Sequence, residues 1–198
     1  MTDDCKYLLS LMGIPYLDSP TEAEAQCAMM VKLGKAYAVA SEDMDSLAFG
    51  ANVLLRGFGS RREPITEINL KDVLEGLEMG ILEFVDLCIL CGCDYSPTIE
   101  GVGMTTALKL MKQLNSIEEV IRFIDAKTTG NYKIPEYFPY AEAREIFLNP
   151  DVDRDIHLNW ETSDSSAVYN FLVRQKGFNP VRVENGLQKL THFSNKPS

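Results

Sequence analysis

The sequence predicts an α/β protein in which a small parallel sheet with helices is followed by an almost wholly helical region. Three short apolar segments at 36–40, 53–58 and 65–69 have the length and composition of strands. A helical pattern precedes them, and helical patterns dominate from Leu70 onward. Because strands and helices alternate in the first half, we expect an α/β domain there.

Length and composition limit the classes of protein. A chain of 198 residues with 45% hydrophobic residues fits one large domain, or a core with a helical extension. No apolar run approaches the roughly 20 residues that span a bilayer. The amino terminus lacks the basic and apolar regions of a secretory signal, so the five cysteines are expected to be reduced thiols.

The first elements are predicted from caps and helix stops. A helix over 2–12 ends at Gly13, and 14–17 is a plausible edge strand. Ser19 is expected to cap the next helix, with Pro20 at its first helical position and Glu22 completing a capping box. Gly34 should end that helix.

The later elements follow the same reasoning. A basic turn over 59–64 should join the second and third strands, and Ser116 and Asn179 are expected to cap helices. The predicted helices of this half lie at Leu70–Leu77, Ile81–Cys91, Met104–Leu114, 116–124, 141–148, 166–175 and 180–190.

Five acids are candidate metal ligands. Glu22 and Glu24 open a helix, Asp43 and Asp45 follow the strand at 36–40, and Asp94 follows another apolar run. Each pair alone has an ordinary explanation, as helix-capping acids or as an acidic loop. Together they resemble the carboxylate sets that hold two Mg²⁺ ions for phosphodiester cleavage.

A second motif is the glycine pattern Gly101-Val102-Gly103 between two predicted helices. Such a turn leaves backbone N–H groups free at a helix N-terminus, where a phosphate can bind. It is also the hairpin of helix–hairpin–helix modules, which hold the DNA backbone. An ordinary helix–helix turn remains the alternative.

Two features argue for other interpretations. The net charge of −10 is unusual for a nucleic-acid-binding protein, unless metal ions offset the acids at the contact. The Cys88-x-x-Cys91-x-Cys93 pattern could indicate zinc, but both histidines lie far along the chain. We therefore interpret these cysteines as small apolar residues of a buried helix.

The ordered motifs closely resemble the flap endonucleases of the XPG/Rad2 family of structure-specific 5′ nucleases. The resemblance runs nearly end to end and is carried by Glu22-Ala-Glu24-Ala, Ser41-Glu-Asp43-Met-Asp45, Phe84–Leu90, Gly92-Cys-Asp94-Tyr and Gly101-Val-Gly103. It implies a partial PIN-like α/β fold followed by a helix–hairpin–helix region, with the two parts at 1–96 and 97–198.

The family also implies an activity and its residues. It implies a nucleus-located, Mg²⁺-dependent endonuclease and 5′–3′ exonuclease that cuts 5′ flaps and branched DNA in replication and repair. By position the metal ligands and catalytic residues would be Glu22, Glu24, Asp43, Asp45 and Asp94. Glu22, Gly92, Asp94, Gly101 and Gly103 would lie against DNA, and Thr98, Ile99 and Val102 would offer oxygens to a K⁺ ion shared with a phosphate.

The resemblance covers only the later part of the family's nuclease core. Two further metal-binding aspartates, the helical arch that positions the flap, and the peptide that binds the sliding clamp have no counterpart in this chain. Three hypotheses follow: an endonuclease with fewer metal ligands, a non-catalytic relative that binds DNA or a partner, and a fragment that needs a separate amino-terminal half. No membrane partner is expected.

Overall fold

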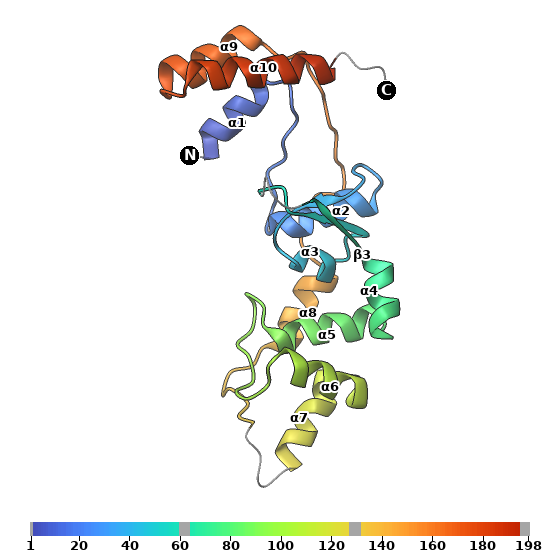
Figure 1. Ribbon diagram of the computed structural model, residues 1–198. Coiled ribbons are helices and arrows are strands. Elements are labelled where there is room, and N and C mark those ends of the chain that lie inside the picture. The colour runs from blue at the N-terminus through green and yellow to red at the C-terminus, as the bar shows by residue number, and fades with distance from the viewer. Residues whose placement is uncertain (1, 60–63, 127–131, 195–198) are drawn as a thin grey trace. The chain divides into compact units, whose positions relative to one another are not determined.

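The computed structural model describes residues 2–59, 64–126 and 132–194. They form two compact units, one of residues 19–156 and one that joins residues 1–18 to residues 157–198 (Figure 1). The predicted division at 96/97 concerns functional regions and falls inside the larger unit. None of the described helices is long and apolar enough to cross a membrane.

The larger unit contains a small mixed sheet, which confirms the α/β class. Strands β1 (Val39–Ala40), β2 (Val53–Arg56) and β3 (Thr66–Asn69) lie in that order. β1 and β2 are parallel, with Val39 opposite Leu54, whereas β2 and β3 are antiparallel. The expected all-parallel arrangement is thus wrong for β3, because the connection over 57–65 is shorter than the dozen or so residues of a parallel crossover. The predicted basic turn lies mostly outside the described residues.

Helix α5 (Ile81–Cys91) is the centre of this unit. It contacts α3 (Asp45–Ala48), α6 (Met104–Leu114), α7 (Ile117–Ala126) and α8 (Tyr140–Leu148), and Figure 1 shows it between α8 and the α6–α7 pair. Val85, Ile89 and Leu90 are fully buried. A helix that is apolar on nearly every side is stable only when it is surrounded, which explains its central place.

Apart from the short helix α3, which the sequence did not predict, most helices of the unit agree closely with their predicted limits. α4 spans Leu70–Leu77, and α7 begins at Ile117, directly after the predicted cap Ser116. α2 (Ala23–Lys32) differs, because Glu22 is its N-cap residue. Ser19 instead donates its hydroxyl to the Glu22 carbonyl, at 2.9 Å from oxygen to oxygen, and so shapes the turn before the helix. The Ser19 cap and the helical Pro20 are therefore wrong predictions.

A buried ion cluster connects three of these helices. Asp86 on α5 is only 4% exposed, and its carboxylate accepts hydrogen bonds from the Arg144 guanidinium on α8 at 2.6 and 2.8 Å. The same carboxylate accepts the Ile117 N–H at the start of α7, at 3.1 Å. Arg144 also binds Glu118 at 2.8 and 3.0 Å, and this contact lowers the pKa of Glu118. The cluster fixes α7 and α8 against α5.

The smaller unit consists of α1 (Thr2–Leu11), α9 (Ser165–Tyr169) with its π-helical continuation η1 (Asn170–Gln175), and α10 (Pro180–Ser194). Val168, Phe171 and Val183 are buried, and Tyr7 meets the Phe171 ring edge-on at 5.0 Å. The predicted cap at the start of α10 is confirmed, because Asn179 Oδ1 accepts the Arg182 N–H at 3.1 Å.

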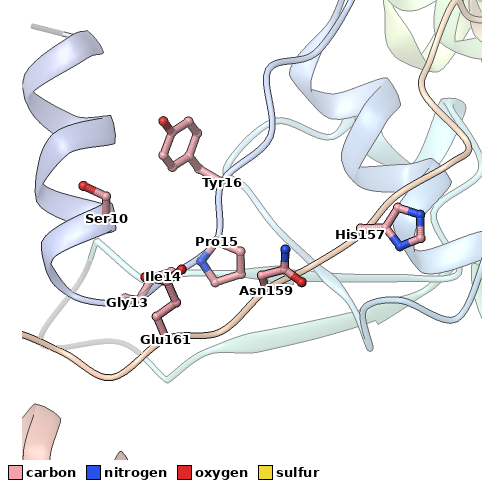
Figure 2. Close-up of a pocket in the computed structure, with 8 residues that line it drawn as sticks. All are labelled: Ser10, Gly13, Ile14, Pro15, Tyr16, His157, Asn159 and Glu161. Atoms are coloured by element: carbon pink, nitrogen blue, oxygen red, sulfur yellow. The ribbon is translucent and has the colours of Figure 1, made fainter.

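Residues 14–17 are extended but form no β-ladder among the described residues, so that predicted strand is wrong. The neighbouring Gly13 carbonyl instead accepts the Glu161 N–H at 3.0 Å, in an irregular pairing with the segment before α9. A pocket of about 240 Å³ lies along this pairing. Figure 2 shows His157, Asn159 and Glu161 following one another along one of its two segments. Glu161 is its single carboxylate, and none of the predicted site residues lines it.

Replacing Arg144 by Met should lower the free energy of unfolding by about 3 kcal/mol, because the Asp86 carboxylate would stay buried without its partner. Urea unfolding followed by circular dichroism measures this loss. The matched control is Arg122→Met, which removes an exposed pair with Glu119 and should cost less than about 1 kcal/mol. Equal losses in the two variants would contradict a stabilising role for the buried cluster.

Candidate metal centre and hairpin

Glu22 and Glu24 stand at the entrance of α2. Glu22 has an extended backbone, with φ −75° and ψ 132°, while Glu24 lies in the first helical turn. Within a helix, side chains two residues apart point in nearly opposite directions. Because Glu22 precedes the helix, this restriction does not apply, and both carboxylates can serve the same region.

Asp43 and Asp45 follow the end of β1 and lead into α3. The Asp43 N–H donates to the Ser41 hydroxyl at 3.0 Å, and the Asp45 N–H donates to the Asp43 carboxylate at 2.9 Å. These successive turns order the loop locally. The loop is also held from a distance, because the Ser41 N–H donates to the Leu55 carbonyl at 3.2 Å and the Gly57 N–H donates to the Glu42 carboxylate at 2.8 Å. A serine two residues before an aspartate, as Ser41 is before Asp43, is a common turn signal.

Asp94 is placed by the end of α5. Gly92, the C-cap residue, has φ 116° and ψ 131°, a backbone conformation that side-chain-bearing residues avoid. A Cβ atom at Gly92 would also lie 3.2 Å from the Thr98 methyl group. The glycine therefore lets the chain leave the helix sharply and present Asp94 beyond it.

The electrostatics show that these acids occupy one neighbourhood. Partial burial and the negative charges of Asp43, Asp94, Glu24 and Glu22 together raise the pKa of Asp45 to about 6. Four carboxylates from three separate segments thus act on a fifth. Carboxylate oxygens are the ligands that Mg²⁺ prefers, so the chemistry of this set fits a hard divalent cation.

The acids are gathered but do not form a closed ligand shell. Within the described ranges, no group of three Asp, Glu, His or Cys side chains is close enough to hold an ion. Asp43 and Asp94 are exposed, and Asp45 is half-buried. The arrangement can attract a divalent cation through its field, and side-chain rotation would have to complete the coordination.

Of the three cysteines next to this set, Cys88 and Cys93 pack against the core, whereas Cys91 is exposed, so the predicted burial is wrong for Cys91. Cys88 lies in the interior of α5, and burial, with smaller effects of Cys91 and nearby groups, raises the pKa of its thiol to about 12. A thiol with so high a pKa stays protonated at neutral pH and is a poor metal ligand. This supports the interpretation of Cys88 as a small apolar residue.

The predicted hairpin lies directly before α6. Ile99 and Val102 are buried, and the Val102 N–H donates to the Ile99 carbonyl at 3.0 Å. Gly101 has φ +84°, which favours glycine, and Gly103 is the N-cap residue of α6. The unpaired N–H groups of the first turn of α6 follow the hairpin. Thr98 is exposed at its start.

Comparison with known proteins shows what this chain is similar to. Residues 13–94 match the model of the XPG I-region, a span that ends at Asp94. The flap endonuclease 1 of Aspergillus fumigatus is 53% identical over 194 residues, which is 94% of this chain and 49% of that protein. The chain is a homologue of the flap endonucleases. It spans about half the length of the curated relatives it matches.

Solved structures agree with this assignment. The flap endonuclease-1 from Methanococcus jannaschii superposes with a TM-score of 0.81 at 34% identity, covering 96% of this chain and 56% of that one. The Holliday junction-resolving enzyme GEN1, solved with product DNA and a Mg²⁺ ion, gives a TM-score of 0.72 at 26% identity, covering 96% and 55%. The fold of this homologue is therefore that of the XPG-family nucleases.

Replacing Asp45 by Asn should stabilise the metal-free chain near pH 7. The pKa of Asp45 is higher in the folded state than its ordinary value of 3.8, so the ionised carboxylate disfavours folding at pH values above about 6. The midpoint of thermal unfolding should rise by about 2–4 °C per kcal/mol gained, and this gain should shrink as the pH falls from 6 toward 4. Mg²⁺ should raise the midpoint of the parent more than that of the variant.

Thermal unfolding with and without Mg²⁺ provides both measurements. Asp72→Asn, on the exposed face of α4, is the control and should change neither the metal-free midpoint nor the response to Mg²⁺ appreciably. A metal-free Asp45→Asn chain less stable than the parent would contradict the clustering of the five carboxylates.

Proposed function

We propose that this chain acts as a structure-specific nuclease, or forms the metal-binding part of one. The nuclease would hydrolyse phosphodiester bonds in branched DNA. The proposed reaction is of the 5′ flap endonuclease and 5′–3′ exonuclease type, in DNA replication and repair. One observation supports it most directly: homology to flap endonucleases coincides with four acids from three segments whose charges act on a fifth, Asp45.

The acids have the proposed role of holding two Mg²⁺ ions, the ligand set being Glu22, Glu24, Asp43, Asp45 and Asp94. When bound, such ions lower the pKa of an attacking water and stabilise the leaving oxygen. The chain itself determines where these carboxylates lie. Asp43 orders the loop before Asp45 through the Asp45 N–H, and Gly92 directs Asp94 past the end of α5.

The hairpin has the proposed role of holding the DNA backbone. The N–H groups that open α6 point toward the hairpin side, where the helix dipole favours a phosphate. Burial of the Ile99 and Val102 side chains supports a rigid turn. Backbone oxygens of Thr98, Ile99 and Val102 would then be available to a K⁺ ion, with Gly92, Gly101 and Gly103 allowing close approach of the strand.

The wider setting is proposed from the same homology. The region 1–96 would supply the metal centre and 97–198 the hairpin module, acting in the nucleus on DNA with a 5′ flap. The sliding clamp, the expected partner of a flap endonuclease, is proposed as a protein partner. Bound cations would also offset part of the net charge of −10 when DNA approaches.

A second function is a non-catalytic role in binding branched DNA or a protein partner. It is favoured by one observation, that no three potential ligands converge within the described part of the chain. In this case the hairpin and the helices after it would bind the DNA or the protein partner, and the acids would have no catalytic role. Binding without cleavage distinguishes this function from the first.

A labelled 5′-flap duplex incubated with the 198-residue chain and Mg²⁺ tests the main proposal. We expect cleavage that EDTA abolishes. The Asp43→Ala/Asp45→Ala variant should be slower by at least about a hundredfold, a loss of ~2.7 kcal/mol in stabilisation of the transition state. Product analysis on a sequencing gel measures the rate and the cleavage position.

The matched control is Asp72→Ala/Glu75→Ala, which removes two exposed acids of α4 and should cut at the parent rate. Cleavage by the Asp43/Asp45 variant at the parent rate would contradict the metal assignment. DNA binding by a folded parent that cleaves nothing would favour the non-catalytic function.

A further inference from the structure

A cavity of about 500 Å³ opens in the larger unit beside the entrance of α2. Its walls come from the segment before α2, from the residue after Asp94, and from α8 with the chain that follows it. Glu22 is the only residue that it shares with the proposed metal ligands. The volume lies in the range of small-molecule sites, roughly 300–1,000 Å³.

The floor of the cavity is aromatic and rigid. Phe49, which is 1% exposed, packs against Tyr95 at 6.4 Å and against Phe147 at 4.9 Å between ring centroids. Tyr95 meets Phe147 edge-on at 5.3 Å. Ile146, which is 37% exposed, adds an aliphatic wall. A ligand with an apolar body would displace water from these surfaces, which is favourable at roughly 25 cal/mol per Å².

The rim is negatively charged throughout. It carries the exposed side chains of Glu22, Glu142, Glu145 and Asp151, and no Lys, Arg or His is among the described residues that line the cavity. Asn149 donates to one Glu145 oxygen at 2.9 Å, which holds that carboxylate in place.

No basic side chain of α8 neutralises the rim carboxylates. Arg144 lies between Glu142 and Glu145 in the sequence of α8, but its guanidinium is bound to Asp86 and Glu118. Those contacts direct Arg144 toward α5 and α7. The carboxylates of α8 therefore face the cavity without an internal counter-charge.

From this combination we infer a binding site for a small amphiphilic cation, a primary ammonium or guanidinium group attached to an aromatic or aliphatic body. The apolar body would lie over Tyr95 and Ile146, and the charge would lie among the rim carboxylates. An aromatic ring beside the cation adds a further attraction. The site shares Glu22 with the proposed metal ligands, but binding there does not require phosphodiester cleavage.

Three probes with the same apolar body and different charges test the inference: 2-phenylethylamine, 2-phenylethanol and 3-phenylpropionate. Protein NMR chemical shifts in Mg²⁺-free buffer give the affinity and locate each probe on the full chain. We expect the ammonium compound to bind at least about tenfold more tightly than the alcohol, with shifts at Tyr95 and Ile146, and the carboxylate not to bind.

Two variants separate charge from shape. Glu142→Gln/Glu145→Gln should weaken binding of the ammonium compound by about three- to tenfold and leave the alcohol unchanged, as expected for exposed charge pairs. Ile146→Ser should weaken both. The control Asp72→Asn/Glu75→Gln removes the same two charges on α4 and should change neither affinity.

Equal affinities for the ammonium compound and the alcohol would overturn the inference, as would failure of the ammonium compound to bind. A loss of affinity in Asp72→Asn/Glu75→Gln equal to that in the Glu142→Gln/Glu145→Gln variant would also overturn it, because the effect would then come from net charge alone. Cleavage activity enters none of these readouts, so the outcome is independent of the proposed nuclease function.

Discussion

Repulsion among five carboxylates is the constraint on which the rest of the larger unit depends. Like charges at short range separate unless the elements that carry them are held by something stronger. Here the loop after β1, the start of α2 and the chain beyond α5 bring their acids together, and partial burial with the charges of the other four acids raises the pKa of Asp45 to about 6. The hydrophobic core must hold these elements together against the repulsion, and a bound cation would remove it.

Helix α5 is the element that resists the repulsion. Its completely buried side chains tie it to the sheet side of the unit, while Asp86 ties it to α7 and α8. The same helix ends at Gly92, so the position of Asp94 depends on this core, and the hairpin follows a few residues later. The five acids and the hairpin are thereby attached to one rigid support, as the proposed nuclease function would require.

Local chemistry in the sequence predicted much of this structure. The limits of α4, α5 and α6 followed from apolar periodicity and from glycines near their ends, since these signals act within a few residues. The acids could be grouped because they follow a strand or open a helix, positions that commonly meet at one edge of a sheet. The resemblance to a nuclease family then supplied the role of each acid, which spacing alone left open.

The errors arose where a residue had two possible partners or where the decisive contact was distant. The Ser19 hydroxyl could accept a hydrogen bond from a helix N–H or donate one to a backbone carbonyl. It donates to the Glu22 carbonyl. The direction of β3 depended on the length of its connection to β2. The link between Asp86 and Arg144 joins residues 58 positions apart, and no local pattern identifies it. The carboxylate-rimmed cavity is likewise made from segments that only the fold brings together.

The most direct measurement is the pKa of Asp45 in the metal-free chain. Carboxyl ¹³C NMR over a pH titration measures it in the parent and in the Asp94→Asn variant. A value near 6 in the parent that falls in the variant is expected, because Asp94 is distant in sequence and acts on Asp45 only through space. A parent value near the ordinary 3.8, or one that the loss of Asp94 leaves unchanged, would show that the five carboxylates do not form one site.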